Sequence, residues 1–163
     1  MKKYRALLIN DIRQIFTDPM LMASVIGPLA LLFIARYGFP LFDDWLADHY
    51  GFQLSAYIPF AASFLLIVIP LLPGAMAGLL MLDDRDENII NYYAVTPLAR
   101  KGYFRYRLFL PSLLTLLMSG LFILSSGLTE ARLEYILTVV LLVLEALMLA
   151  LFLTSFASNK VEG

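Results

Sequence analysis

The chain has 163 residues with a net charge of −1; 61% of them are hydrophobic, 15% are charged, and the mean hydropathy is +0.80. A soluble domain of this composition could not cover itself with polar side chains, so we expect a membrane protein. The absence of cysteine excludes disulfides and cysteine-bound metals, and the single histidine, His49, cannot form a metal site without several carboxylates.

Residues 1–19 are predicted to form an amphipathic helix at the membrane interface. Apolar side chains recur there at spacings of three and four residues, at Tyr4, Leu7, Leu8, Ile12, Ile15 and Phe16. Pro19 ends this helix and can open the next one, with Thr17 or Asp18 as its cap. A cleaved signal peptide is the alternative, but no small-x-small cleavage site follows the next apolar run.

Four runs are long and apolar enough to cross a bilayer, which takes about 20 residues as a helix. They are residues 20–42, 55–82, 108–129 and 135–158. Arg36 lies within the first run and is expected to extend its guanidinium to the headgroups, and Glu145 interrupts the fourth. The fold class is therefore an all-α membrane protein, a single domain over 1–163 with four transmembrane helices and the interfacial helix.

The distribution of Lys and Arg predicts the orientation of these spans. If alternate loops lie on the same side, ten basic residues lie on one side and only Arg36 and Arg132 on the other. The positive-inside rule then places both termini and the 83–107 loop in the cytoplasm. The opposite loop, 43–54, is acidic and aromatic, and we interpret it as an interfacial anchor.

Polar and small residues inside two spans have two interpretations each. Glu145 costs about 3 kcal/mol at the centre of a span, which the surrounding apolar residues outweigh by contributing roughly 4 to 8 kcal/mol. It is either part of a substrate path for a cationic compound or a protonated or hydrogen-bonded group between helices. Gly74 and Gly78 let another helix approach closely, at a dimer seam or in ordinary packing within the chain.

The 83–107 loop is longer than a connection between two spans needs. Its segment "DENIINYYAV" predicts a short helix opened by acidic residues, and Thr96 and Pro97 end that helix and begin the next. The loop is either a docking site for another protein or an interfacial helix whose charges are only solvated.

The order of these features resembles the membrane subunit of type-2 ABC transporter permeases, including those of the fluoroquinolone-exporter kind. In that family an acidic-basic-acidic stretch, a short helix, a "TPL" or "SPL" turn and a tyrosine with a basic residue lead into the third span. The matching residues are Asp84, Arg85, Asp86, Glu87, Thr96, Pro97, Leu98, Tyr103 and Arg107. Such permeases have six spans, so this chain is expected to be a fragment or a truncated product.

The resemblance implies a multi-pass protein of a bacterial or archaeal cell membrane that exports a hydrophobic or amphipathic compound as a homo- or heterodimer. Residues 87–95 would be the coupling helix that docks on a separate ATP-binding subunit. The residues expected to act in coupling are Asp86, Glu87, Ile89, Tyr92, Tyr93, Thr96, Pro97 and Arg100. No cofactor is expected on this chain, since ATP would be bound by the partner.

Other classes of function find little support in the sequence. There is no phosphate-binding loop, no Ser-His-Asp set and no HExxH motif, so we do not expect an enzyme and name no catalytic residue. The basic residues flank spans, which argues against nucleic acid. The rival hypothesis is a four-span membrane scaffold, or a small ion- or proton-linked carrier that uses Glu145.

Overall fold

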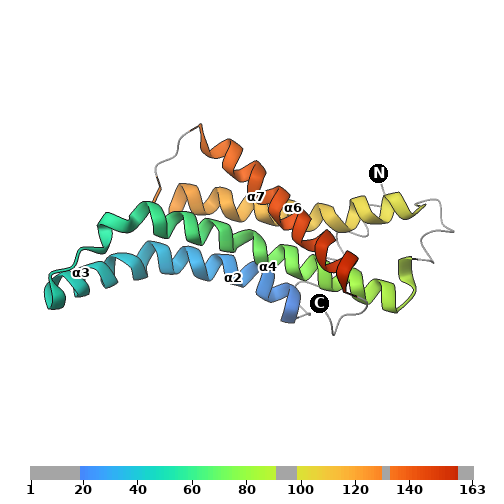
Figure 1. Cartoon of the computed structure of the whole chain (residues 1–163), viewed down its shortest axis with the longest axis horizontal. Coiled ribbons are helices and arrows are strands. Elements are labelled where there is room, and N and C mark those ends of the chain that lie inside the picture. Colours follow the sequence, from blue (N-terminus) through green and yellow to red (C-terminus); the bar gives the residue numbers. More distant parts are fainter. Residues whose placement is uncertain (1–18, 91–98, 130–132, 158–163) are drawn as a thin grey trace.

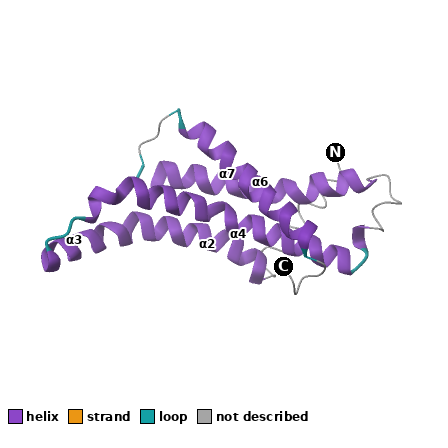
Figure 2. Cartoon of the chain, viewed as in Figure 1, coloured by secondary structure: helices purple, strands orange, loops and turns teal. Residues whose placement is uncertain are grey.

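The structure, a computed structural model, describes residues 19–90, 99–129 and 133–157. These residues form helices joined by loops and contain no strand (Figures 1 and 2). The elements are α2 (Pro19–Phe33), the π-helical segment η1 (Ile34–Gly38), α3 (Phe39–Tyr50), the 3-10 helix η2 (Leu54–Tyr57), α4 (Ile58–Asp86), α6 (Ala99–Ser125) and α7 (Tyr135–Phe156). The all-α prediction is confirmed; the interfacial helix predicted over 1–19 lies almost entirely outside the described residues.

Four helical stretches are long and apolar enough to cross a membrane, as predicted. They are Met22–Tyr50, Leu54–Asp86, Lys101–Ser125 and Tyr135–Phe156. Large apolar side chains are exposed along their outer faces, for example Phe64 at 60%, Leu124 at 72% and Leu137 at 66%. In a bilayer these side chains face hydrocarbon, so their exposure is expected.

The first membrane-crossing stretch ends later than predicted. The structure continues it without a break through η1 and α3 to Tyr50, beyond the expected end at Phe42. The apolar residues around Trp45 share one helical face and the acidic residues share the opposite one, so this part of the chain forms an amphipathic helix. Gly51, at φ 65°, ends the helix, and its N–H donates to the carbonyl of Ala47 at 3.0 Å.

Two other helices extend into the charged loop. α4 runs to Asp86, past the end expected for its span at Leu82. α6 is helical from Ala99, ahead of the span expected from 108; a helix leading into that span was predicted to begin at Thr96 and Pro97, which lie outside the described residues. Asp83, Asp84 and Asp86 therefore lie, with Arg85, in the last turn of α4. A charge does not stop a helix where water is available, because the backbone hydrogen bonds continue regardless of the side chains.

Helix α4 is the centre of the bundle and contacts α2, α6 and α7. Its contact with α7 depends on small residues. A Cβ atom added to Gly74 would lie 2.7 Å from the Ala146 carbonyl oxygen, and one on Gly78 would lie 2.9 Å from Leu153 Cβ. The two glycines thus serve close packing within the chain, because any larger side chain would push α7 away.

The bundle has two chemically different ends, which lie far apart along its long axis (Figure 1). The end of α4 and the start of α6 meet at what we call the basic end, which carries Arg85, Lys101, Arg105 and Arg107. Helix α7 also finishes there, since Arg85 contacts its last carbonyls. The opposite, aromatic end carries Phe42, Trp45, Tyr50, Phe52 and Tyr57.

Candidate functional site

A buried polar cluster joins α4 to α6 at the basic end. The Tyr103 hydroxyl donates to Asp84 Oδ2 at 2.5 Å, and Arg107 Nη2 forms an ion pair with the same oxygen at 2.7 Å. Asp84 is 8% exposed and Tyr103 is 2% exposed. A carboxylate at this depth is stable only with such partners, since burying it alone would cost several kcal/mol, of the order discussed for buried ions. The three residues therefore fix α4 and α6 against each other where the 83–107 loop leaves and re-enters the bundle.

The neighbouring residue, Arg85, joins α4 to α7. Its Nη1 donates to the Thr154 carbonyl at 3.2 Å and its Nη2 donates to the Ala157 carbonyl at 2.6 Å. These carbonyls lie at the C-terminal end of α7, where helical acceptors have no intrahelical donor and the helix dipole is negative. Arg85, in the last turn of α4, thus provides hydrogen-bond donors for the carbonyls at the end of α7.

The described part of the loop begins with a tight turn. The Glu87 N–H donates to the Asp83 carbonyl at 2.9 Å, and the Asn88 N–H donates to the Arg85 carbonyl at 3.0 Å. Asn88 has φ 59°, a left-handed conformation that asparagine adopts more readily than most residues, and this ends α4. The chain is helical again at residues 89–90.

The predicted coupling residues are only partly described. Asp86 and Glu87 are exposed beside this turn, and Ile89 is half-buried. Arg100 lies in the first turn of α6, but its side chain is not described. The predicted coupling residues Tyr92, Tyr93, Thr96 and Pro97 lie outside the described residues.

A shallow groove of about 520 Å³ contains Glu145. Its lining is Leu71, Glu145, Met148, Leu149, Leu151, Phe152, Ser155 and Phe156. Glu145 is half-buried, and within the described residues its carboxyl has no hydrogen-bond or ion-pair partner. A carboxyl group in a mostly apolar wall suits a compound with an apolar body and a cationic group.

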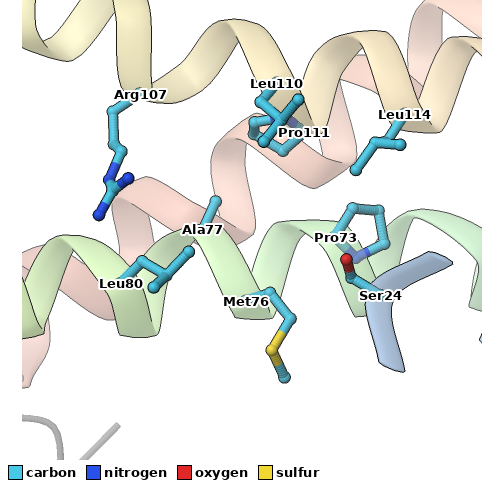
Figure 3. Close-up of a pocket in the computed structure, with 9 residues that line it drawn as sticks. All are labelled: Ser24, Pro73, Met76, Ala77, Leu80, Arg107, Leu110, Pro111 and Leu114. Atoms are coloured by element: carbon cyan, nitrogen blue, oxygen red, sulfur yellow. The ribbon is translucent and has the colours of Figure 1, made fainter. Parts of the chain in front are cut away.

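A second, much smaller cavity lies between α2, α4 and α6 (Figure 3). Its volume is about 20 Å³, the size that a water molecule needs and too small for a drug. Figure 3 shows Ser24 from α2, Met76 from α4 and Pro111 from α6 around it, with Arg107 at one end. This cavity is therefore too small to hold an exported compound.

Side-chain contacts order the aromatic end. The Asp43 carboxylate accepts the N–H groups of Leu54 and Ser55 at 2.6 and 3.1 Å, and so caps the start of the second membrane-crossing stretch. The Trp45 ring stacks with Phe42 and His49 at centroid distances of 6.0 and 4.9 Å. No group of three potential metal ligands occurs among the described residues, so this end offers no metal site there.

The sequence did not show that Asp84, Arg85, Tyr103 and Arg107 act together. They appeared only as members of a family pattern, and their contacts depend on how three helices meet. One signal was available: acidic and basic residues lie at the facing ends of two successive apolar runs, which must be antiparallel neighbours if the connection stays on one side of the membrane.

Known proteins provide an independent comparison. A family model described as "Fluoroquinolones export permease protein Rv2686c-like" matches residues 11–163. Two curated proteins of Mycobacterium tuberculosis are similar to the chain: fluoroquinolones export permease protein MT2760 of strain CDC 1551 / Oshkosh and fluoroquinolones export permease protein Rv2686c of strain ATCC 25618 / H37Rv. Each is 34% identical over 157 residues, which cover 94% of this chain and 62% of the relative. The chain thus spans less than two thirds of the length of these relatives.

No solved structure matches the chain. The family match nevertheless covers nearly the whole sequence and includes the buried cluster, the Arg85 contact and the Glu145 groove. The chain belongs to the family of fluoroquinolone export permease proteins similar to Rv2686c.

Proposed function

We propose that this chain is the membrane-spanning permease subunit of an ATP-driven exporter of hydrophobic or amphipathic compounds. The observation that carries the proposal is the family match over residues 11–163, whose relatives are named as fluoroquinolone export permeases. A fluoroquinolone is therefore the first compound to test. The basic end would face the cytoplasm, because Lys and Arg collect on the inner side of membrane proteins.

ATP would be hydrolysed by a separate ATP-binding subunit, docked on the 83–107 loop. Asp86 and Glu87 are exposed beside the turn at Asn88, where they can set charge complementarity with that subunit. Tyr92, Tyr93 and Ile89 would supply the apolar contact, and Thr96 and Pro97 would form the rigid elbow before α6. Arg100 and Lys101 would complete the charged rim.

Two permease chains are expected in the complete transporter, either identical or related. The compound would reach the groove at Glu145, whose carboxyl would bind a cationic group while Met148 and Phe152 contact its apolar part. The permease would bind and orient the compound, and ATP hydrolysis in the ATP-binding subunit would drive export.

Co-purification tests this proposal. The chain carries an affinity tag, is produced in its native cells and is solubilised from their membranes with detergent. An ATP-binding subunit with a phosphate-binding loop should co-purify, and charge reversal at Asp86 and Glu87 (Asp86→Lys with Glu87→Lys) should weaken its retention. Glu134→Lys is the matched control, since Glu134 is exposed beside the start of α7, at the aromatic end. Isolation of a folded chain without any ATPase would contradict the proposal.

One observation favours a second candidate, an ion- or proton-linked carrier: the Glu145 carboxyl has no polar partner within the described residues. Such a carrier needs no ATPase. Transport by the purified chain alone in proteoliposomes, driven by a proton gradient and abolished by Glu145→Gln, would select this candidate.

A further inference from the structure

Arg85 stands at the point where three parts of the molecule meet. It belongs to the last turn of α4, it is followed by the exposed residues Asp86 and Glu87 at which the chain leaves that helix, and its guanidinium binds the last carbonyls of α7. Its Cα is covalently tied to the loop, and its side chain holds a helix that is distant in sequence. Movement of the loop can therefore reach the end of α7 through the Arg85 side chain.

The contact is specific in geometry. Both terminal nitrogens of Arg85 donate, one to Thr154 and one to Ala157, and the chain leaves the helix at Ala157 with ψ 136°. The planar guanidinium can bind two acceptors at once in a fixed arrangement, which an ammonium group cannot reproduce. Arg85 therefore determines where the end of α7 lies relative to α4.

A cavity beside the contact leaves space for movement. It measures about 350 Å³ and lies between the inner ends of α4, α6 and α7. Its lining includes Arg85, Phe104, Leu151 and the loop residue Ile90. Ile90 and Arg85 thus both face the last turns of α7, so a shift of the loop changes the support of that helix.

Helix α7 also carries the candidate substrate site. Glu145 precedes Thr154 by nine residues, about 14 Å along a helix. Ala146 lies against Gly74 and Ala150 lies near Gly78, so small residues line the surface along which α7 can slide or tilt. Displacing its inner end moves the whole helix, and with it one wall of the groove.

We propose that Arg85 is a positioning residue that transmits movement of the loop where it leaves α4, after Asp86, to α7, and thereby to the groove at Glu145. The proposal rests on the proposed function, since an ATP-binding subunit must move the loop. Asp84 has a different role, because its bonds to Tyr103 and Arg107 keep α4 and α6 together as the fixed part against which α7 moves.

The absence of cysteine makes a direct test possible. Ser155→Cys introduces one exposed thiol in the last turn of α7 and in the wall of the Glu145 groove, so an environment-sensitive fluorophore attached there, in the absence of any exported compound, reports directly on that wall. The labelled chain is purified with its ATP-binding subunit and placed in lipid nanodiscs, and its fluorescence is followed on addition of Mg-ATP. Arg85→Gln and Arg85→Lys are compared with Arg105→Gln, an exposed arginine at the same end of the bundle.

The labelled chain with Arg85 and the Arg105→Gln control should show an ATP-dependent fluorescence change of equal size. Arg85→Gln should reduce it about fivefold or more while ATP turnover continues, and Arg85→Lys should give an intermediate response. Equal responses in all variants would overturn the role of Arg85. If Arg85→Gln does not fold, a full response in Arg85→Lys would overturn it instead.

The remaining outcomes separate this inference from the proposed function. If the ATP-binding subunit is bound but the unsubstituted chain shows no ATP-dependent change, α7 does not move and the inference is wrong, while the proposed function stands. If no ATP-binding subunit is retained at all, the proposed function fails, and the inference fails with it.

Discussion

Tyr103 on α6 donates a hydrogen bond to Asp84 on α4 across 2.5 Å, in a site where Tyr103 is 2% exposed. Arg107, one turn after Tyr103, pairs with the same carboxylate oxygen. One acidic side chain thus holds two residues of the next membrane-crossing helix. The contact lies at the two ends of the loop that we propose as the docking site, so its loss should affect stability and loop position together.

Removing the carboxylate charge should destabilise the bundle. Asp84→Asn removes the carboxylate that pairs with the largely buried Arg107 guanidinium, which we expect to cost about 3 kcal/mol. Tyr103→Phe removes the hydroxyl that donates to Asp84 but leaves the ion pair of Asp84 with Arg107, and should cost about 1 to 2 kcal/mol. Thermal unfolding of the purified chain in detergent measures both, with Asp86→Asn as the control because Asp86 is exposed. Equal unfolding temperatures for the Asp84 and Asp86 variants would contradict this account.

The packing of α4 on α7 predicts that alanine destabilises the protein at Gly74 but is tolerated at Gly120. Gly74→Ala places a Cβ 2.7 Å from the Ala146 carbonyl oxygen, a backbone atom that cannot move without shifting α7. We expect a destabilisation of about 1 to 3 kcal/mol. Gly120→Ala, within α6, meets nothing within 4 Å and should be neutral or slightly stabilising, since alanine favours helix. A neutral Gly74→Ala would show that the helices are not packed this closely.

The charge of Glu145 is predicted to affect export of cationic compounds and not the folding of the chain. In the complete transporter, Glu145→Gln should reduce export of a cationic amphipathic compound about tenfold, a loss of roughly 1.4 kcal/mol in binding, and leave a neutral one unchanged. Glu134→Gln is the control, since it makes the same change at an exposed position before α7. Cells expressing each variant are loaded with the compound, and efflux is followed. Wild-type efflux of the cation by Glu145→Gln would favour the interpretation as a helix-packing group.

Much of this fold follows from the sequence, because a bilayer imposes strict requirements on apolar length. The four crossing stretches, the close approach at Gly74 and Gly78 and the acid at Glu145 were all identifiable from apolar runs and residue size. The residues at which the first crossing stretch and α4 end were not identifiable in this way. Counting apolar residues measures how much chain suits hydrocarbon, whereas α4 and α6 continue as helices into water.

The contacts at the basic end required the structure. Asp84 and Tyr103 are 19 residues apart, and Arg85 and Ala157 are 72 apart, so no local pattern links them. The π-helical segment at Ile34–Gly38 likewise has no sequence signal in the apolar pattern that predicts the first span. Such segments change the register of the side chains that follow, here those of α3.

The orientation of the bundle can be measured on the same cysteine-free background. Gln53→Cys lies at the aromatic end and Lys101→Cys at the basic end, and both positions are exposed. A membrane-impermeant maleimide added to intact cells should label Gln53→Cys and leave Lys101→Cys unlabelled until the membrane is opened, because the basic end is expected inside. The reverse pattern would place the 83–107 loop outside and remove it from any cytoplasmic ATPase.

The central claim is that the 83–107 loop couples ATP hydrolysis in a partner to export through this chain. The most direct measurement compares export and ATP turnover in the complete transporter with and without Tyr92→Ala and Tyr93→Ala. We expect the double variant to insert normally and to lose export while ATP turnover no longer responds to the exported compound. Export that remains fully coupled to ATP hydrolysis in that variant would contradict the claim.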